Sequence, residues 1–458
     1  MVFSSAVFLS LYLPFFLVLY FLLRSVKYKN VVLVISSLVF YAWGEPVWVI
    51  LLLFSGCMDY VNGRVIEAYR GQWQAKAALT LSIVINLGIL SLFKYSGFVV
   101  ENINALLGMS IASPRFNLPI GISFYTFQTL TYTIDAYRGK FKAQKSLLGY
   151  LTYLTMFPPL VAGPIVRYLD VREQINRRTI TQKMVSEGIT RFAVGLGKKV
   201  ILANSVGEAA STLLDSNLNF LSGSGAWLGI VFFAFQIYFD FSGYSDMAIG
   251  LGKMLGFTLP ENFNYPYISK SVTEFWRRWH MSLGTFFRDY VYIPLGGNRR
   301  FMLRNLAIVW FLTGLWHGAS WNFILWGIYY LLLLVLEKIF LGSLLERLPG
   351  IFGIIYNIAA VLFGWMLFYF TDFARLGDFF RASMFQNGAT DVLTTSVFTG
   401  RIFLIVVCII GCTPIPRRIA ESLRGFRLIT PIFSAALLII SFMLVMAQTF
   451  SPFLYFAF

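Results

Sequence analysis

The chain has 458 residues, of which 58% are hydrophobic and 13% charged, and its formal net charge is +16. Soluble globular proteins carry about 25% charged residues, so this composition excludes a water-soluble enzyme and indicates a protein of the lipid bilayer. We attribute the positive charge to Lys and Arg in cytoplasmic loops, where membrane proteins concentrate them, rather than to nucleic-acid binding.

The apolar residues form long uncharged runs. A helix needs about 20 mainly apolar residues to cross the hydrocarbon core, and several runs reach this length with their flanks while others fall short. We therefore expect an all-α polytopic protein with about ten to twelve membrane helices, some of them short or re-entrant and buried inside protein. No linker divides the chain, so residues 1–458 are predicted to form a single membrane domain. The runs are residues 7–23, 77–92, 227–239, 306–315, 323–336, 351–370 and 432–446.

The distribution of charge predicts which loops share a side of the membrane. The first apolar run is followed, not preceded, by the positive residues Arg24, Lys27 and Lys29, which places the N-terminus outside. Residues 206–224 contain acidic residues but no Lys or Arg, so this segment is predicted to be an external loop. Five segments contain more basic than acidic residues and are predicted to be cytoplasmic: residues 64–76, 138–145, 167–183, 262–304 and 414–427.

The middle of the chain does not fit a strict alternation of sides. Lys145 and Arg167 would both be cytoplasmic, yet one apolar stretch separates them. That stretch contains Pro158, Pro159 and Pro164, which interrupt a helix. We therefore predict re-entrant or half-crossing helices around these prolines.

Residues 262–304 combine charge, aromatic side chains and turn residues. A surface loop would have fewer aromatics and a transmembrane helix fewer charges. Amphipathic helices that lie at the membrane interface, or dip part-way in, fit this composition best. The predicted apolar face consists of Phe275, Trp276, Trp279 and Phe286, and the predicted polar face of Arg277, Arg278 and Arg288.

The chain contains only two histidines, His280 and His317. A single histidine in an apolar chain is more often a satisfied core residue than a catalyst, but an ionisable group at membrane depth is costly and is by default a functional hypothesis. Around His317, Gly314 and Gly318 leave room for backbone or substrate to approach closely. A neutral imidazole is the form that a general base needs.

The sequence contains no motif for metal binding, for a serine hydrolase or for nucleotide binding. Cys57, Cys408 and Cys412 lie in apolar segments, where we expect them to be buried small hydrophobes. Cys408 and Cys412 share a helical face, but two thiols without His or carboxylate company do not make a metal site. The chain has no Gly-x-Ser-x-Gly elbow, no Walker A sequence and no His-Glu-x-x-His. A histidine that removes a proton from an acceptor hydroxyl, as that hydroxyl attacks an activated acyl group, needs none of these.

Five long segments and the C-terminus resemble the bacterial membrane-bound O-acyltransferases, and the alginate O-acetylation branch in particular, with its peptidoglycan and cellulose O-acetylation relatives. The matching segments occur in the family's order over nearly the whole chain. They are residues 119–139, 157–167, 236–257, 275–299 (FWRRWHMSLGTFFRDYVYIPLGGNR) and 314–327 (GLWHGASWNFILWG), with SPFLYFAF at residues 451–458. One difference is Phe286-Phe287, where many relatives are expected to have a Trp at one position.

The resemblance implies a fold and roles for both histidines. The family's hallmark histidine matches His317, which would be the principal catalytic group, and the Trp-His-x-Ser-Leu histidine matches His280, also taken as essential in this branch. The implied fold is a ring of membrane helices around a central tunnel. The implied reaction takes acetyl from a cytoplasmic donor, acetyl-CoA, with no bound cofactor, and passes it to an extracellular partner of the SGNH type that modifies a polysaccharide. The implied location is the bacterial cytoplasmic membrane.

Further candidates surround the histidines. Arg277, Arg278 and Arg288 could bind donor phosphates by charge-assisted hydrogen bonds, or could be ordinary positive-inside charges. Asp240 could orient an imidazole, but it or Asp246 could equally form a structural pair with an arginine. The predicted tunnel lining comprises Trp316, Trp279, Asp289, Gln128, Tyr125 and Asp240, with Asp135 as a further candidate.

Two other functions remain open at this point. One is D-alanyl transfer to teichoic acid from a carrier protein, which the C-terminal SPFLYFAF and the length disfavour. The other is transport of a polysaccharide precursor, since broken helices and buried charges also occur in transporters, although no inverted repeat is visible.

Overall fold

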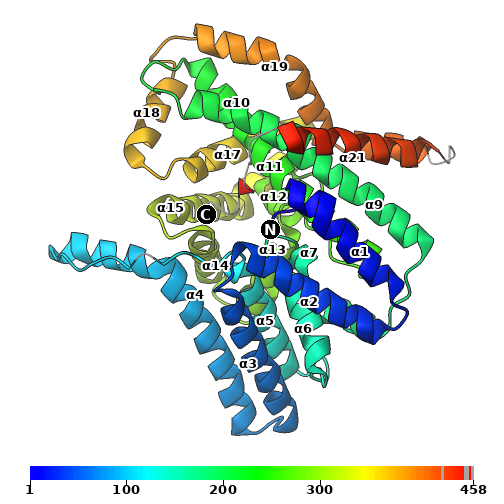
Figure 1. Ribbon diagram of the computed structural model, residues 1–458. Coiled ribbons are helices and arrows are strands. Elements are labelled where there is room, and N and C mark those ends of the chain that lie inside the picture. Colours follow the sequence, from blue (N-terminus) through cyan, green and yellow to red (C-terminus); the bar gives the residue numbers. More distant parts are fainter. Residues whose placement is uncertain (115, 424–427, 448–452, 455–458) are drawn as a thin grey trace. The chain divides into compact units, whose positions relative to one another are not determined.

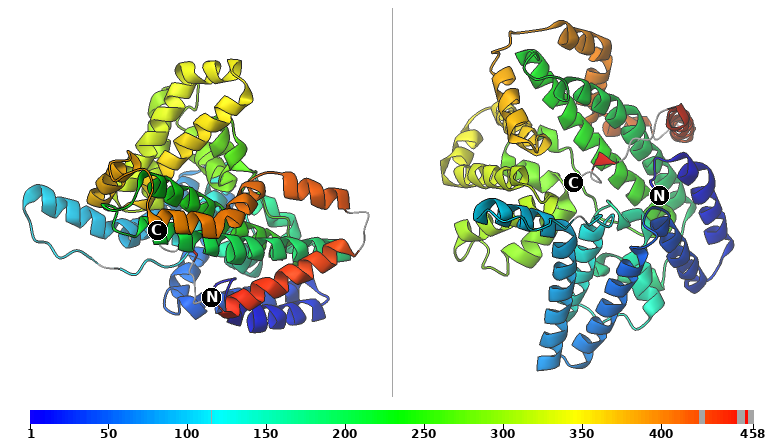
Figure 2. Two further views of the ribbon diagram at one scale, coloured as in Figure 1. Left: turned by 90° about the horizontal axis from the view of Figure 1, so that it is seen from above. Right: turned by 60° about the vertical axis from the view of Figure 1, so that its left-hand side comes forward.

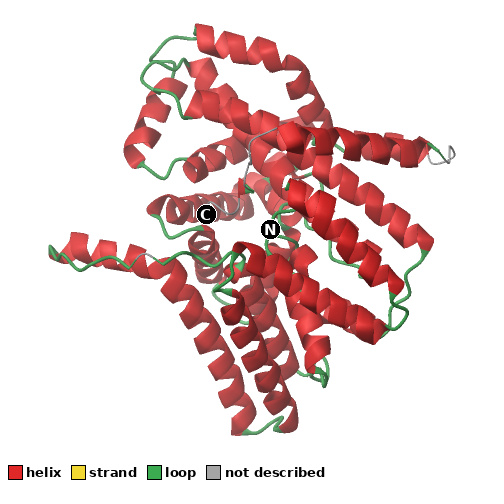
Figure 3. Ribbon diagram, viewed as in Figure 1, coloured by secondary structure: helices red, strands yellow, loops and turns green. Residues whose placement is uncertain are grey.

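The computed structural model describes residues 1–114, 116–423, 428–447 and 453–454, and the ordered elements among these residues are all helical (Figure 1 and Figure 3). This confirms the predicted all-α class. The chain divides into two compact units. One consists of Met1–Phe192 with Ser245–Pro260, and the other of Ala193–Tyr244 with Glu261–Phe458. The prediction of a single domain over residues 1–458 stays a prediction, and each unit is described by itself.

The first unit begins with a π-helical turn that runs directly into α1, followed by helices of very different length. The long helices α3 and α4 run side by side in every view (Figures 1 and 2). The elements are η1 (Phe8–Tyr12), α1 (Leu13–Leu22), α2 (Val26–Gly44), α3 (Val49–Ala68), α4 (Trp73–Leu107), α5 (Ile122–Tyr137), α6 (Leu147–Thr155), α7 (Phe157–Leu160), α8 (Tyr168–Asn176) and most of α9 (Gln182–Gly197).

Helices α3, α4 and α5 share a buried polar cluster. The Asp59 carboxylate on α3 is fully buried and accepts a hydrogen bond of 2.7 Å from the Asn86 amide on α4. The Asn86 oxygen in turn accepts hydrogen bonds from Ser55 on α3 and Thr129 on α5. At Gly63 an added Cβ would lie 2.5 Å from the Tyr132 ring, so this glycine lets α3 and α5 approach closely.

The segment around the prolines is made of short buried helices, as the sequence predicted. Helix α6 has nine residues and α7 only four, and Phe157, Pro158 and Pro159 are buried. Neither helix has the length of about 20 residues that crossing a bilayer requires. The re-entrant course of this segment in the membrane stays a prediction.

The second unit contains both histidines. Its elements are η2 (Lys198–Ala203), α10 (Asn204–Leu214), most of α11 (Gly223–Met254), η3 (Pro266–Ile268), α12 (Val272–Arg278), α13 (Met281–Phe287), η4 (Arg288–Tyr292), α14 (Met302–His317), α15 (Trp321–Leu336), η5 (Glu337–Leu341), α16 (Gly342–Arg347), α17 (Gly350–Tyr369), α18 (Phe373–Ser383), α19 (Val392–Gly411), α20 (Ile415–Ser422) and α21 (Ile429–Ala447).

Seven helices in the described part of the chain are long and apolar enough to cross a membrane, which confirms a multi-pass membrane protein. Helices such as α2, α5 and α14 fall outside this set, so the total of ten to twelve stays a prediction. The seven are Val49–Ala68, Trp73–Leu107, Gly223–Met254, Trp321–Arg347, Gly350–Tyr369, Val392–Gly411 and Ile429–Ala447, and Phe8–Leu22 is a shorter apolar helix.

Three sequence-based expectations were wrong. The predicted loop at residues 64–76 is mostly helix, because α3 continues to Ala68 and α4 begins at Trp73. The predicted external loop at residues 206–224 is partly helix, because α10 continues to Leu214 and α11 begins at Gly223, so only residues 215–222 connect the two helices. Cys57 is exposed on the outer face of α3 rather than buried.

Candidate active site

His317 is the last residue of α14, at a sharp reversal into α15. Gly318 adopts an extended conformation that ends the helix, and Trp321 begins the next one. The side chain of His317 is buried, with 5% of its surface exposed. Its ring is enclosed by aromatic rings: Trp316 at 4.9 Å, Trp326 of α15 at 4.9 Å and Phe368 of α17 at 5.2 Å between centroids.

The glycines near His317 make room for protein rather than for a ligand. A Cβ added at Gly314 would lie 2.4 Å from the Phe323 carbonyl oxygen, and one at Gly318 would lie 2.2 Å from the Phe323 ring. On the facing helix, a Cβ at Gly327 would lie 2.5 Å from the Trp310 carbonyl oxygen. Helices α14 and α15 therefore contact backbone to backbone, which fixes the position of His317. The sequence allowed for backbone or substrate beside these glycines. Gly314 lies against backbone, whereas Gly318 lies against the Phe323 ring.

His280 lies between α12 and α13 in a left-handed conformation with φ 43°. This conformation is uncommon for a residue other than glycine and clusters at functional sites. The imidazole is buried, with 2% exposed, and its Nδ1 atom lies 3.0 Å from the Asn262 Oδ1 atom. The Phe241 ring of α11 stands edge-on to it at 4.6 Å.

Burial alone lowers the pKa of His280 to about 3 from its ordinary value of 6.5. The cause is desolvation, which penalises the imidazolium form. The ring is therefore neutral at physiological pH, the state in which histidine can accept a proton. His280 lies outside the seven candidate spans.

Trp316 joins the two histidines into one aromatic cluster. Its ring lies 5.8 Å from the His280 ring and 4.9 Å from the His317 ring. Trp279, next to His280, packs at 4.9 Å against Trp365 of α17. The structure thus brings together both predicted catalytic residues, along with Trp316 and Trp279 from the predicted tunnel lining, within the second unit.

Of the predicted apolar face in residues 262–304, Phe275, Trp279 and Phe286 are buried and Trp276 is half-buried. Of the predicted polar face, Arg277 and Arg288 are exposed and Arg278 is half-buried. The position of this segment at the membrane interface stays a prediction. Helix α12 is held at its first turn by Glu337, whose carboxylate accepts hydrogen bonds from the backbone amides of Val272 (2.6 Å) and Thr273 (2.8 Å). A carboxylate suits a helix N-terminus, where the amides are unpaired and the dipole is positive.

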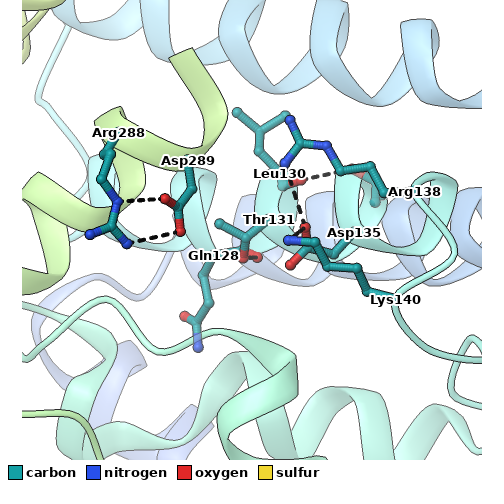
Figure 4. A network of polar contacts seen from close by, with 9 residues as sticks. Gln128, Leu130, Thr131, Asp135, Arg138, Lys140, Arg288 and Asp289 are labelled. Atoms are coloured by element: carbon teal, nitrogen blue, oxygen red, sulfur yellow. Dashed lines mark hydrogen bonds and ion pairs between the residues drawn. The ribbon is translucent and has the colours of Figure 1, made fainter. Parts of the chain in front are cut away.

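The three candidate phosphate-binding arginines differ in their surroundings. Arg278 pairs with Glu274 at 2.6 Å, and Arg288 pairs with Asp289 at 2.7 Å (Figure 4). Arg277 is exposed. Asp289 is therefore engaged by its neighbour Arg288, and its role in lining a tunnel stays a prediction.

Asp240 and Asp246 form ion pairs of the structural kind. Asp246 pairs with Arg191 at 2.9 Å, which is one of the two alternatives that the sequence left open. Asp240 pairs with a lysine instead of an arginine: Lys199 Nζ lies 2.6 Å from Oδ1, and both side chains are buried. The second oxygen, Oδ2, accepts a hydrogen bond of 2.7 Å from the backbone amide of Leu454, so the Asp240 carboxylate also holds this residue.

The buried pair predicts a strong effect of removing one partner. In a Lys199→Met variant the Asp240 carboxylate would stay buried without its cation, which costs about 3–5 kcal/mol. We expect a fall in the unfolding temperature of the detergent-purified protein, measured by intrinsic fluorescence. The double variant Lys199→Met with Asp240→Asn keeps an acceptor for Leu454 and should recover most of the loss. Equal losses in both would contradict a role for the charge pair.

In the first unit, Gln128 and Asp135 have structural partners, whereas the Tyr125 hydroxyl has no hydrogen-bond partner among the described residues. On α5, Gln128 donates a hydrogen bond to the Tyr153 carbonyl at 3.1 Å, and Tyr125 is buried. Asp135 is paired with Lys140 at 2.8 Å and with Arg138 at 3.9 Å (Figure 4). The assignment of Gln128 and Tyr125 to a tunnel stays a prediction. Of the C-terminal SPFLYFAF, only Phe453 and Leu454 lie within the described residues, and Phe453 is buried.

Sequence reasoning missed four residues of the site: Asn262, Glu337, Trp326 and Phe368. A signal existed for one of them, because Glu337 is an acidic residue directly after an apolar run. Asn262 begins the segment that contains His280, but nothing in the sequence shows that it folds back onto that histidine. Trp326 lies within the segment 314–327 that carries the family resemblance, but nothing in the sequence points it toward His317, and Phe368 has the character of an ordinary membrane-helix residue.

Comparison with known proteins places this site in a family. Residues 136–377, which include both histidines, match the family model "MBOAT, membrane-bound O-acyltransferase family". The chain is 43% identical over 376 residues to the "probable alginate O-acetylase AlgI" of Azotobacter vinelandii, covering 80% of this chain and 75% of that protein. It is 38% identical to the protein of the same description from Pseudomonas putida over 494 residues, covering all of both chains.

A third relative acts on a different polymer. The peptidoglycan O-acetyltransferase of Helicobacter pylori is 33% identical over 364 residues, covering 72% of this chain and 68% of that protein. The family match spans more than half of this chain, and the relatives extend it over most of the rest. The chain therefore belongs to the membrane-bound O-acyltransferase family, in the branch of the alginate O-acetylases, and is an O-acyltransferase.

Proposed function

We propose that this protein transfers acetyl groups from cytoplasmic acetyl-CoA across the membrane toward an extracellular polysaccharide, with His317 as the principal catalytic base and a partner protein of the SGNH type as the next carrier. We propose alginate as the polysaccharide, because the chain is similar to probable alginate O-acetylases. The observation that carries the proposal is the pair of histidine rings joined through Trp316, in a chain 38–43% identical to probable alginate O-acetylases.

The chemistry proposed for His317 is general base catalysis. The neutral imidazole takes the proton of an acceptor hydroxyl as the hydroxyl oxygen bonds to the acetyl carbonyl carbon. The carbon–sulfur bond of the thioester then breaks, and the imidazolium returns its proton to the departing thiolate. This sequence needs no covalent intermediate on His317. The enclosing rings of Trp326 and Phe368 would exclude water, which would otherwise hydrolyse the thioester.

The proposed location is the bacterial cytoplasmic membrane, with the N-terminus outside. Arg24, Lys27 and Lys29 follow the first apolar helix and support that orientation. In this arrangement the basic segment that contains Arg277 would face the cytoplasm, where acetyl-CoA is available.

Among the three candidate arginines, we expect Arg277 to contribute most to donor binding, because Arg278 and Arg288 are in ion pairs with their neighbours. An Arg277→Ala variant should raise KM for acetyl-CoA about tenfold, with kcat changed less, since a charge-assisted hydrogen bond contributes about 1.5–3 kcal/mol. The measurement is release of free CoA by the purified protein. Arg418→Ala, which removes an exposed arginine on α20, is the matched control. A tenfold effect in the control as well would indicate a general effect of surface charge.

The function is tested by the acetyl content of surface polymers in a strain that lacks the gene. We expect loss of ester-linked acetate from an exopolysaccharide, restored by the wild-type gene. Loss of D-alanine esters from teichoic acid instead would support the D-alanyl transfer alternative. Normal levels of both esters would refute the proposal. Co-purification of the tagged protein from its own membranes, followed by mass spectrometry, tests for the SGNH-type partner.

A further inference from the structure

Hydrogen bonds around His280 converge on one oxygen atom. The Asn262 Oδ1 atom accepts hydrogen bonds from the Ser282 backbone amide (3.2 Å) and the Ser282 hydroxyl (2.9 Å), and it lies 3.0 Å from His280 Nδ1. The three residues are buried, and no surface of Asn262 is exposed. These hydrogen bonds therefore belong to the protein interior and are not a surface contact.

The backbone amide of Ser282 shows which side-chain atom of Asn262 faces it. A backbone N–H can only donate, so the side-chain atom of Asn262 that faces it must be the carbonyl oxygen and not the amide nitrogen. An oxygen in that position can only accept from the imidazole. It follows that His280 Nδ1 carries the proton, and that in the neutral ring the lone pair is on Nε2.

We propose that Asn262 is a positioning residue that holds His280 in the Nδ1–H tautomer, so that Nε2 is the nitrogen available for proton transfer in the acyl-transfer site. The role of this tautomer in catalysis rests on the proposed function, whereas the tautomer itself does not. Asn262 acts through His280 and need not touch the substrate.

The backbone supports the same assignment. The Met281 amide donates to the Asn262 carbonyl at 2.9 Å, and the Asn264 amide donates to the Arg278 carbonyl at 2.9 Å. These two bonds tie the chain before η3 to both sides of His280. They stabilise the left-handed conformation at His280, which is unfavourable for a residue other than glycine.

The tautomer can be measured directly, because the chain has only two histidines. Protein labelled with ¹⁵N-histidine and reconstituted in lipid nanodiscs should give two imidazole spin systems, and the His317→Gln variant identifies that of His280. We expect the protonated nitrogen of His280 at neutral pH to be Nδ1. A proton on Nε2, or an even mixture of tautomers, would overturn the proposal. The spectrum does not depend on acyl transfer, so this result is separate from the test of the proposed function.

Two substitutions at Asn262 separate positioning from packing. Asn262→Leu removes the acceptor at similar volume and should lose the Nδ1–H preference, with kcat at least about tenfold lower and KM changed by less than about threefold. Asn262→Asp keeps an acceptor oxygen and should retain the Nδ1–H proton. Ser282→Ala, which removes a different hydrogen bond to the same oxygen, should leave the tautomer unchanged. An Asn262→Leu protein with the wild-type tautomer would refute the role of Asn262. If that variant does not fold, the spectra of the wild-type and Asn262→Asp proteins still decide.

Discussion

The His317→Ala variant is expected to lose acetylation of the polysaccharide while the protein remains in the membrane at its normal level. His317 ends α14 inside an aromatic enclosure and is the proposed base for the acceptor hydroxyl. General base catalysis contributes about 100- to 10,000-fold, so we expect acetyl transfer to fall by at least about 100-fold. The measurement is ester-linked acetate on the polymer of a complemented deletion strain, together with the amount of protein by immunoblot.

The alanine substitution also leaves a cavity among Trp316, Trp326 and Phe368. His317→Gln is therefore the matched control, because glutamine fills most of the space and can form hydrogen bonds but cannot act as a base near neutral pH. Both variants should be inactive, whereas only His317→Ala should have a clearly lower unfolding temperature. Wild-type acetyl content in a stably expressed variant of either kind would rule out His317 as the base.

The second large effect is expected at His280. His280→Ala should abolish nearly all acetylation, because it removes the Nε2 atom proposed for proton transfer. It also removes the ring that contacts Trp316 and Phe241, and one donor to the Asn262 oxygen. A fully active variant would show that His280 is structural or serves only the donor. His280→Phe keeps the aromatic packing and separates these causes: it should fold and be inactive. Activity in His280→Phe would assign the residue to packing.

The lowered pKa of His280 also predicts how stability depends on pH. Below pH 6.5 the unfolded chain binds a proton at this histidine, whereas the folded chain does not until about pH 3. The contribution of the neutral His280 ring to the free energy of unfolding is therefore complete above pH 6.5. It decreases as the pH drops below 6.5, by up to about 1.4 kcal/mol per pH unit. His280→Phe removes this loss, so its unfolding temperature should fall less between pH 6.5 and pH 4.5 than that of wild type. Equal acid sensitivity would contradict the burial of a neutral ring.

Much of the fold follows from the sequence, and the exceptions have physical causes. Uncharged runs at residues 323–336 and 351–370 correspond closely to α15 and α17, because length and hydropathy determine a membrane helix. Helix α3 was missed because Asp59, Arg64 and Glu67 interrupt its apolar pattern. Its carboxylate is satisfied by Asn86 of the next helix, a tertiary contact that no local pattern reveals.

Part of the candidate site could likewise be predicted from the sequence, and part could not. The two histidines could be found because they are the only ones in the chain and stand within distinctive motifs. Their contact through Trp316 depends on the packing of α12 and α13 against α14, and the partnership of Asn262 with His280 depends on a fold-back over 18 residues. The pairing of Asp240 with Lys199 was likewise inaccessible, since the two lie on different helices and the sequence offered an arginine as readily as a lysine.

The buried contact between Asp59 and Asn86 has a consequence for how the protein is made. A carboxylate near the middle of a lone helix opposes insertion into the bilayer by about 2.5–3.5 kcal/mol. Helix α3 gains the Asn86 amide only after α4 has been synthesised, 27 residues later. The two helices should therefore leave the translocon together as a hairpin. The Asn86 amide should therefore favour the membrane integration of α3 as well as the stability of the folded unit.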